Sequence, residues 1–564
     1  MPESWYVQAC RTWLQVLDEA VALHGDRELF VYKDRHVTYA EFDRLSSDLA
    51  KGLIEIGVKP KDVVAIWMTN SLDWVVCQFA IYKTGAILLP IYSYYREAEL
   101  DHAIRQAGVK TLIMSDNFLG KIDAVGIFTG LVPEAETVAA AEFGSERFPT
   151  LESVIVVDET RPLPSRFHYD AVMEAGRSSK HDEELLRRQM RISPFDVMNI
   201  MYTSGTTGFP KGGMSMHVTN LSTVIHWSAI AELTPDDTIL CHVPLFTNLG
   251  ALYVACLAIY NGSRVIITEQ FDAANSLRLI ETEKVTYIPG TPSVFRLLLD
   301  HEDIAKTDLS SVRGGHVAGA PLTEKAMTEI IEVLGCREVM QAWGLSECGG
   351  LSTVTSKHDT LERRLKTVGK PLPNARVKIV DTETGQDAPT GQPGEIYLHD
   401  VHPGSCVGAG YYGMPEQTAK TINAEGFFKT GDTGYFDEEG YLYLSGRVDD
   451  MFTVGGFNIY PAEIENQIDQ IEGISEAYVV SMEDRRLGRV PVAWVMLDAT
   501  ASLTEGEIIS LCKSKLSSQK VPRRVFFYQP GELPMTAGGK IKKKDLTLLT
   551  EKLVAEISLQ PQGA

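Results

Sequence analysis

The sequence predicts an α/β protein whose large N-terminal part is built on doubly wound, mainly parallel sheets. Short apolar, β-branched runs at residues 63–66, 111–114 and 154–157 are separated by amphipathic stretches such as 41–56 and 98–107. Buried strands that alternate with helical periods are typical of parallel sheets covered on both faces. The 564 residues also exceed the length at which one hydrophobic core stops growing, so at least two domains are expected.

The segments after the first strands and helices differ from them in amino-acid composition and in the expected length of their elements. Residues 120–149 are rich in Ala and Glu with weak periodicity, and we expect a helix-containing excursion at the surface there. After about Gly369, short strands punctuated by Gly and Pro are expected at 376–380, 394–398 and 441–445. Such strands predict a small β-rich subdomain.

The chain beyond Arg447 predicts a compact α+β domain. The expected elements, in order, are a strand, a helix at 461–470, strands at 477–482 and 491–497, a helix at 505–516 and a strand at 524–528. We place the domain boundary at Gly446, where a glycine precedes a charged turn. The predicted domains are therefore 1–446 and 447–564.

Composition and charge exclude several classes of protein. The 53 Lys and Arg residues against 75 Asp and Glu residues give a formal charge of −22, which argues against broad contact with nucleic acid. The eight cysteines are scattered singly, without zinc-ligand spacing, as expected in a reducing, cytoplasmic setting. No leader is recognisable, and no run approaches the ~18 apolar residues that a transmembrane helix needs. The oligomeric state is not indicated.

Residues 202–212 form the clearest chemical motif. They follow the apolar run 197–201, and they combine three glycines and several hydroxyls with one lysine. Glycines expose backbone N–H groups, and hydroxyls and an ammonium group add donors for nucleotide phosphates. The candidate phosphate ligands are Thr203, Ser204, Gly205, Thr206, Thr207, Gly208 and Lys211. An ordinary Ser/Thr/Gly turn is the alternative; the G-x-x-x-x-G-K-[ST] spacing of a P-loop is absent.

This string resembles the signature of the adenylate-forming superfamily, which contains acyl-CoA synthetases, adenylation domains and luciferases. Further motifs of that superfamily follow in the same order at residues 341–347, 430–432, 446–465 and 534–540. The resemblance implies an N-terminal domain that binds AMP and the acyl group and includes a small β-barrel-like subdomain. It also implies a small, mobile C-terminal catalytic domain.

The resemblance assigns Glu347 as the Mg²⁺ ligand and, with Thr203, as a catalytic residue. Without it, Glu347 is one of 75 acidic residues, most of which are expected to be solvated. Mg²⁺ prefers one or two carboxylates together with phosphate oxygens and water. Gly344 and Ser346 belong to the same nucleotide segment, with Ser346 in place of the commoner Thr.

The same resemblance implies an adenine site. Trp343 stands where the family usually has Tyr and would stack on the base, and Gln341 would hydrogen-bond its amino group. The opposite face of the base is assigned to Gly319, Ala320 and Pro321. A buried aromatic core residue is the alternative for Trp343.

Further roles are implied near the C-terminus. Asp432 is expected on the ribose hydroxyls, Arg447 on the nucleotide, and Asp449 at a hinge; surface turns are the alternatives for the two acids. Gly455 and Gly456 would line the tunnel for the thiol. Lys540 is the main catalytic candidate, because an ammonium group can stabilise charge at the transferred phosphorus. Its alternative is a place in the solvated basic tail in which Lys542, Lys543 and Lys544 are expected.

These assignments predict an ATP-dependent carboxylic acid:CoA ligase with ATP, Mg²⁺ and coenzyme A as co-substrates or cofactors. A carboxylate would attack ATP to give an acyl-adenylate and pyrophosphate, and the CoA thiol would then displace AMP. The rival interpretations are an adenylating enzyme that loads a carrier-protein thiol and a non-catalytic nucleotide-binding protein.

One position departs from the family pattern. Thr247 stands where many acyl-CoA synthetases carry a His, which puts aromatic gating in doubt. Amino-acid-activating relatives place an Asp near this point, so an amino acid substrate is disfavoured. The acyl acid itself is not indicated. The expected pocket positions are Trp227, Thr247, Gly250, Pro289, Gly290, Gly314, Gly315 and Val317.

Overall fold

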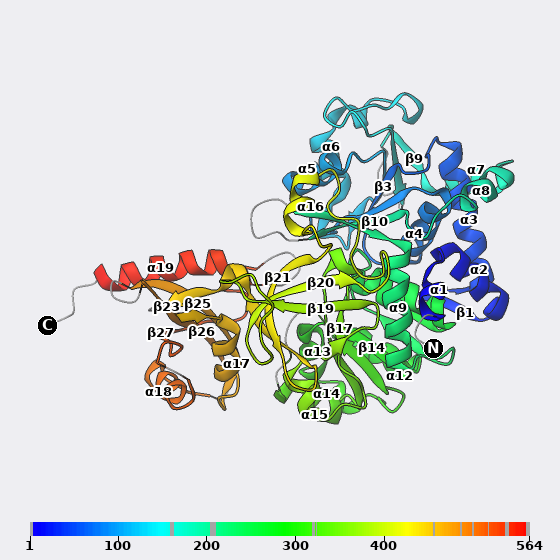
Figure 1. Cartoon of the computed structure of the whole chain (residues 1–564). Coiled ribbons are helices and arrows are strands. Elements are labelled where there is room, and N and C mark those ends of the chain that lie inside the picture. The colour runs from blue at the N-terminus through cyan, green and yellow to red at the C-terminus, as the bar shows by residue number, and fades with distance from the viewer. Residues whose placement is uncertain are drawn as a thin grey trace. The chain divides into compact units, whose positions relative to one another are not determined.

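The computed structural model describes residues 4–157, 163–203, 210–318, 322, 324–454, 457–484, 488–498, 501–516, 518–535 and 541–559 (Figure 1). Contacts divide the chain into two compact units. The first unit is Met1–Arg376 with Leu398–Phe428, and the second unit is Val377–Tyr397 with Lys429–Ala564. The domain boundary predicted at Gly446 lies inside the second unit and stays a prediction.

A seven-stranded sheet in the order β11-β10-β4-β3-β5-β8-β9 carries the first half of the first unit. Its strands are β3 (Val63–Trp67), β4 (Ile87–Pro90), β5 (Thr111–Ser115), β8 (Ser153–Val157), β9 (Arg166–His168), β10 (Val197–Thr203) and β11 (Lys211–Met216). All neighbours are parallel except β10 and β11, which form an antiparallel hairpin. A separate two-stranded hairpin joins β6 (Asn117–Phe118) and β7 (Ile122–Asp123).

A nine-stranded sheet in the order β18-β17-β16-β15-β14-β12-β13-β1-β2 carries the second half. Its strands are β1 (Glu28–Tyr32), β2 (Arg35–Thr38), β12 (Thr238–Cys241), β13 (Arg264–Ile267), β14 (Tyr287–Gly290), β15 (Gly314–Val317), β16 (Glu338–Trp343), β17 (Thr353–Val354) and β18 (Lys370–Pro371). The strands from β16 to β1 are parallel, and the outer strands pair antiparallel.

Helices cover both faces of both sheets, as the doubly wound prediction requires. The shared core of the two sheets contains α2 (Trp13–His24), α3 (Tyr39–Glu55), α4 (Leu72–Thr84), α7 (Tyr169–Arg177), α9 (His217–Ala231) and α11 (Leu257–Asn261). The outer faces are covered by α5 (Glu97–Ala107) and α6 (Ala124–Leu131) on one sheet, and by α12 (Ala273–Thr282), α13 (Pro292–Leu299) and α14 (Glu324–Glu332) on the other. The short helices are α1 (Ser4–Ala9), α8 (Asp182–Gln189), α10 (Asn248–Gly250), α15 (Leu361–Lys366) and α16 (Pro415–Thr421).

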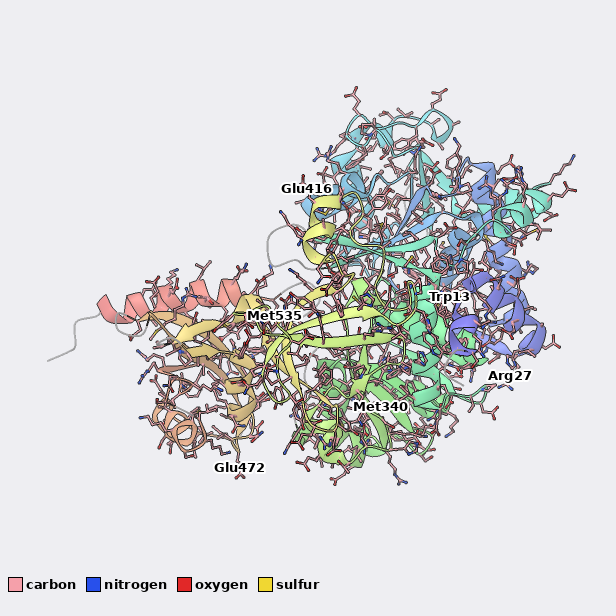
Figure 2. All side chains as sticks on the ribbon, in the orientation of Figure 1. Trp13, Arg27, Met340, Glu416, Glu472 and Met535 are labelled. Carbon is pink, nitrogen blue, oxygen red and sulfur yellow. The ribbon has the colours of Figure 1, made fainter. Side chains whose placement is uncertain are left out.

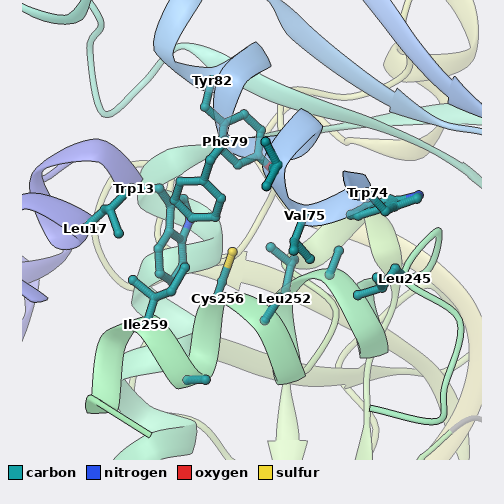
Figure 3. Close-up of a cluster of buried hydrophobic side chains, with 14 of the residues drawn as sticks. Trp13, Leu17, Trp74, Val75, Phe79, Tyr82, Leu245, Leu252, Cys256 and Ile259 are labelled. Carbon is teal, nitrogen blue, oxygen red and sulfur yellow. The ribbon is translucent and has the colours of Figure 1, made fainter. Parts of the chain in front are cut away.

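Strand alternation explains how one strand serves two cores. In β3, Val64 and Ile66 face the shared core, whereas Val63, Ala65 and Trp67 face the core beneath α5 and α6. Figure 3 shows part of the shared core, where Trp13 from α2 and Phe79 from α4 lie beside Cys256. Burying an aromatic or branched side chain of this kind contributes about 1.5–3 kcal/mol.

The second unit holds two sheets. The first, in the order β19-β20-β21-β22, consists of β19 (Ala375–Val380), β20 (Gly394–Asp400), β21 (Phe428–Phe436) and β22 (Leu442–Arg447). The other contains β23 (Phe452–Val454), β24 (Phe457–Ile459), β25 (Ile474–Asp484), β26 (Gly488–Leu497) and β27 (Arg524–Phe527), with α17 (Pro461–Ile468), α18 (Glu505–Lys515) and α19 (Lys543–Leu559). Most residues of the first sheet and all of the second belong to this unit.

The α/β fold class and the main elements are confirmed, with three differences. The excursion at 120–149 contains α6, whose Phe128 is fully buried rather than at the surface. β21 and α19 were not predicted. Because α19 begins at Lys543 and the ammonium Nζ of that residue lies 2.7 Å from Glu465 Oε1, the prediction of a solvated basic tail is wrong for Lys543.

None of the described helices combines the length and apolar character that crossing a bilayer requires.

Candidate active site

The hairpin of β10 and β11 presents the two described ends of the predicted phosphate segment. Thr203 ends β10, Lys211 begins β11, and the two residues are register partners. The Thr203 hydroxyl oxygen lies 3.4 Å from the Lys211 carbonyl oxygen. Both side chains therefore start from the same end of one hairpin. Ser204, Gly205, Thr206, Thr207 and Gly208 lie outside the described residues, so their phosphate contacts stay predictions.

Glu347 lies buried next to this hairpin, with 7% of its surface exposed. It sits in the short turn Ser346–Cys348 that follows β16. Its Oε1 accepts hydrogen bonds from the Thr203 hydroxyl at 3.2 Å and from the Tyr411 hydroxyl at 3.0 Å. A buried carboxylate is strongly destabilising without such donors. The structure thus brings together Thr203 and Glu347, two predicted catalytic residues that lie far apart in the sequence.

Two glycines near Glu347 are required by close packing, one against its side chain and one against the backbone that follows its turn. A Cβ added at Gly213 of β11 would lie 3.0 Å from Cγ of Glu347. A Cβ added at Gly344 would lie 2.5 Å from the carbonyl oxygen of Gly350, a distance that real Cβ atoms do not adopt. Close packing therefore accounts for Gly344, and its predicted contact with a nucleotide stays a prediction.

The donor set fits a magnesium ion that arrives with a nucleotide. Mg²⁺ in proteins usually keeps several waters and uses one or two carboxylates together with substrate phosphates. Within the described ranges, no group of three or more His, Cys, Asp or Glu side chains is arranged to hold a metal. One buried carboxylate beside a hydroxyl-and-lysine hairpin suits that mode of binding.

The predicted adenine residues lie at the end of β16. Trp343 is buried, and its carbonyl oxygen accepts a hydrogen bond from the Ser352 N–H at 2.8 Å. The Gln341 amide nitrogen donates to the carbonyl oxygens of Arg364 and Leu365, at 2.5 and 3.3 Å. The amide oxygen of Gln341 is then the atom suited to an adenine amino group.

Other parts of the predicted base site are less defined. The carbonyl oxygen of Ser346 accepts a hydrogen bond from the Ser215 hydroxyl at 3.5 Å, which ties the turn to β11. The nucleotide contact of Ser346 stays a prediction. Gly319, Ala320 and Pro321 lie outside the described residues.

The second unit holds Asp432 and Arg447 as an ion pair. They are register partners on β21 and β22, and Arg447 Nη1 lies 2.8 Å from Asp432 Oδ1. Gly431 adopts a φ of +72°, and a Cβ there would lie 3.1 Å from Arg447 Nη2. The glycine thus permits the chain to turn at Asp432 while the guanidinium group packs against it.

The hinge candidate Asp449 lies in the short 3₁₀ turn Val448–Asp450 directly after β22. Burial raises the pKa of its neighbour Asp450, while Lys543 and Arg447 act in the opposite direction. The hinge role of Asp449 stays a prediction. Gly455, Gly456 and Lys540 lie outside the described residues.

Thr247 has a local structural task. Its hydroxyl donates to the Pro244 carbonyl oxygen at 2.7 Å and accepts from the Gly250 N–H at 3.3 Å, so it caps α10. A hydroxyl engaged in this way is a poor substitute for a mobile aromatic gate.

The other predicted acyl-pocket positions are closely packed. Trp227 is fully buried, and its ring meets that of His316 edge-on at 4.8 Å. A Cβ at Gly315 would lie 2.2 Å from the carbonyl oxygen of Ile288, so packing between β14 and β15 requires this glycine. The acyl pocket stays a prediction.

Tyr411 is the site residue that the sequence analysis missed. Its hydroxyl shares the Glu347 oxygen with Thr203, and its ring centroid lies 5.6 Å from the Lys211 ammonium nitrogen. In Figure 2, Glu416 marks α16, the helix that follows Tyr411 in the chain, and Met340 marks β16, the strand that precedes the turn of Glu347. The only sequence signal was a Gly-Tyr-Tyr-Gly string at 410–413, which reads as a turn.

A mainly parallel α/β core with a hydroxyl-and-lysine hairpin beside a buried carboxylate defines a nucleotide-dependent enzyme that acts at a phosphate group. The chain belongs to the AMP-binding enzyme family, which matches residues 17–412, and the family of AMP-binding enzyme C-terminal domains matches residues 463–540. The resemblance to the adenylate-forming superfamily is thereby confirmed.

Named relatives cover nearly the whole chain. YngI of Bacillus subtilis (strain 168), whose name places it among acyl-CoA synthetases, is 35% identical over 94% of this chain and 96% of its own length. The mitochondrial medium-chain acyl-CoA ligase ACSF2 of Danio rerio is 34% identical, over 95% of this chain and 88% of its own. The human ACSF2 is 30% identical, again over 95% and 88%.

Solved structures show the same fold. ATP-bound MatB from Rhodopseudomonas palustris matches with a TM-score of 0.78 and 24% identity, covering 96% of this chain and 100% of that one. The anthranilate CoA ligase AuaEII in complex with anthranoyl-AMP matches with a TM-score of 0.81 and 23% identity, covering 97% and 98%.

Proposed function

We propose that this protein is an ATP-dependent carboxylic acid:CoA ligase that works through an acyl-adenylate and releases AMP and pyrophosphate. The reaction class follows from the family and from relatives named as acyl-CoA synthetases and ligases. The observation that carries the proposal is the buried Glu347 carboxylate, which receives hydrogen bonds from two hydroxyls beside the hairpin end where Thr203 and Lys211 pair.

In the first half-reaction, the acid's carboxylate oxygen attacks the α-phosphorus of ATP, and pyrophosphate leaves. Lys211 and the hydroxyls of the 203–208 segment would hold the leaving phosphates, while Lys540 would stabilise charge at the transferred phosphorus. A Mg²⁺ bound with ATP would neutralise phosphate charge next to Glu347. Trp343 and Gln341 would hold the base, and Asp432 and Arg447 the ribose and phosphate.

In the second half-reaction, the CoA thiol attacks the acyl carbon and AMP leaves. Since Lys540 serves only the first step, we propose that the C-terminal domain turns about Asp449 between the steps. Gly455 and Gly456 would then admit the slender pantetheine chain.

For the acyl substrate we propose a medium-chain aliphatic acid. The support is that several relatives at 30–34% identity carry the name medium-chain acyl-CoA ligase. An amino acid substrate remains disfavoured, because the Thr247 hydroxyl is neutral and caps α10. We also propose a cytoplasmic location.

A carrier-protein thiol is the alternative acceptor. A non-catalytic binding protein is disfavoured, because Thr203, Lys211 and Glu347 are not only retained but assembled at one place.

The test is AMP release from ATP and Mg²⁺ with a panel of straight-chain, branched, aromatic and amino acids, each with CoA or with a carrier protein. The proposal expects turnover only with CoA and a kcat/KM maximum at medium chain length. AMP release that follows the carrier protein instead would establish the alternative acceptor. If no acid supports pyrophosphate exchange at all, the ligase assignment fails.

A further inference from the structure

Tyr411 lies in a segment that extends the seven-stranded sheet. Backbone hydrogen bonds join residues 409–412 to residues 212–214 of the edge strand β11. Tyr411 itself pairs with Gly213 in an isolated β-bridge, and its N–H donates to the Thr418 hydroxyl at 3.0 Å. The backbone of Tyr411 is therefore fixed to the hairpin that carries Thr203 and Lys211.

The Tyr411 hydroxyl is one of two donors to the same oxygen of the Glu347 carboxylate. Both it and the Thr203 hydroxyl donate to Oε1, at 3.0 and 3.2 Å. Each carboxylate oxygen offers about two lone-pair sites, so two donors occupy Oε1. Among the residues that the structure describes, no donor to Oε2 is found, and Oε2 is the atom left to meet a cation.

The Tyr411 ring also contacts the other charged group of the site. The ammonium nitrogen of Lys211 lies 5.6 Å from the ring centroid, within the range of a cation–π contact. A single side chain thus touches the group expected at the metal and the group expected at the phosphates.

We infer that Tyr411 is a positioning residue for the ATP·Mg²⁺ substrate, an inference that rests on the proposed function. Its hydroxyl occupies Oε1 and so leaves Oε2 of Glu347 to a metal that would arrive with ATP, and its ring contacts the Lys211 ammonium group that would bind the phosphates. Tyr411 takes no part in bond making. It sets the orientation of two groups before the nucleotide arrives, so that neither needs to be reorganised on binding.

A purely structural role is the competing explanation, because a buried carboxylate needs donors for stability alone. The surroundings of Tyr411 allow the two explanations to be separated. Tyr411 is among the residues that line an open cavity of about 530 Å³, together with Met214, Met414 and Ala419, although the residue itself is buried. Tyr411→Phe, which changes only the hydroxyl, is therefore the variant that separates the two explanations with the least change in packing.

The experiment compares Tyr411→Phe, which keeps the ring, with Tyr411→Leu, which removes ring and hydroxyl. Tyr412→Phe is the matched control, because it removes a hydroxyl from the adjacent residue of the same segment. The readouts are equilibrium binding of Mn²⁺ to the ATP complex by electron paramagnetic resonance, ATP affinity at saturating metal, and the Mg²⁺ dependence of pyrophosphate exchange.

The Phe variant is expected to weaken Mn²⁺ binding about 10-fold, as the loss of a hydrogen bond to a charged group predicts. Its ATP affinity at saturating metal should stay within about 2-fold of the wild type. The Leu variant should show the same metal defect plus a weaker ATP affinity, by about 3- to 10-fold, because the cation–π contact is also lost. The Tyr412→Phe variant should match the wild type.

A Phe variant whose thermal stability falls while its Mn²⁺ affinity is unchanged would overturn the inference. Equal metal and ATP defects in the Phe and Leu variants would overturn the part assigned to the ring. Failure of the proposed function has a different signature: the wild type would bind Mn²⁺ and ATP, but no acid would support pyrophosphate exchange.

Discussion

The two units hold their candidate nucleotide residues in opposite ways. In the first unit, Glu347 is 7% exposed and receives its hydrogen bonds from two neutral hydroxyls. In the second unit, Asp432 is paired with a cation, Arg447, and the two side chains are 14% and 42% exposed. The described partners of the Glu347 carboxylate are neutral hydroxyls, whereas Asp432 has a positively charged partner.

The difference indicates what each group can do. Neutral donors stabilise the charge of Glu347 without cancelling it, which suits a metal ligand. A partly exposed ion pair contributes only about 0–1 kcal/mol, so the proposed binding of ribose hydroxyls by Asp432 would cost little if it replaced Arg447. The first arrangement is buried, and the second is partly exposed. The following variants, in order of expected effect, test that contrast.

The largest effect is expected for Lys540→Ala. We expect pyrophosphate exchange to fall about 10²- to 10³-fold, because an ammonium group at the transferred phosphorus is lost. Thioester formation from supplied acyl-AMP should be largely spared. Lys552→Ala, which changes an exposed lysine on α19, is the control. Unchanged exchange in the Lys540 variant would remove this residue from the mechanism.

Glu347→Gln should follow, with about a 10²-fold loss of exchange at low Mg²⁺ and partial recovery at high Mg²⁺. The amide oxygen can still accept from Thr203 and Tyr411, so the melting temperature should change little. Glu416→Gln, which alters an exposed acid of the same unit, is the control. A loss that does not respond to Mg²⁺ would speak against a metal ligand.

Asp432→Asn should have a smaller effect, confined to the nucleotide. We expect KM for ATP to rise about 10-fold, because hydrogen bonds to a charged acceptor contribute roughly 1.5–3 kcal/mol. Stability should change by less than about 1 kcal/mol. Steady-state kinetics and thermal unfolding measure the two quantities. A large loss of stability with KM unchanged would show that the ion pair is structural.

The smallest effect concerns Asp469 at the end of α17. Burial, followed by the charges of Glu465 and Glu476, raises the pKa of Asp469 from 3.8 to about 8. The unfolded chain loses this proton near its ordinary pKa, whereas the folded protein keeps it, so stability falls as the pH rises through that window. Asp469→Asn should remove this dependence.

Amide hydrogen exchange in α17 and β25 at about pH 5 and pH 8 measures it, because exchange there reports local opening. The protection of the variant relative to the wild type should increase with pH. Glu472→Gln, an exposed acid labelled in Figure 2, is the control. A constant difference between the two pH values would contradict the raised pKa.

The strand and helix pattern of the first unit was predictable because its residues are locally consistent. The predicted strand at 63–66 and helix at 98–107 match β3 and α5 closely, since buried β-branched runs and amphipathic periods need no distant information. β21 was missed because Gly431, at a φ of +72°, lies in its middle and resembles a turn. α19 was missed because its lysine-rich start resembles a solvated tail.

The site was predictable only in part, for a similar reason. Thr203, Lys211 and Glu347 belong to recognisable strings, and the structure places them together. Tyr411 lies in an ordinary Gly- and Tyr-rich string, and only its pairing with β11 gives it a role. A long-range pairing of this kind leaves no local pattern in the sequence.

The return of residues 409–412 to β11 also bears on synthesis. β11 is an edge strand of its sheet, and its partner segment leaves the ribosome almost 200 residues later. Until then the hairpin presents unpaired backbone groups, which are prone to associate with other chains. A nascent chain that stalls before residue 409 should therefore aggregate more readily than one that has passed residue 428, even though both contain all strands of the two large sheets.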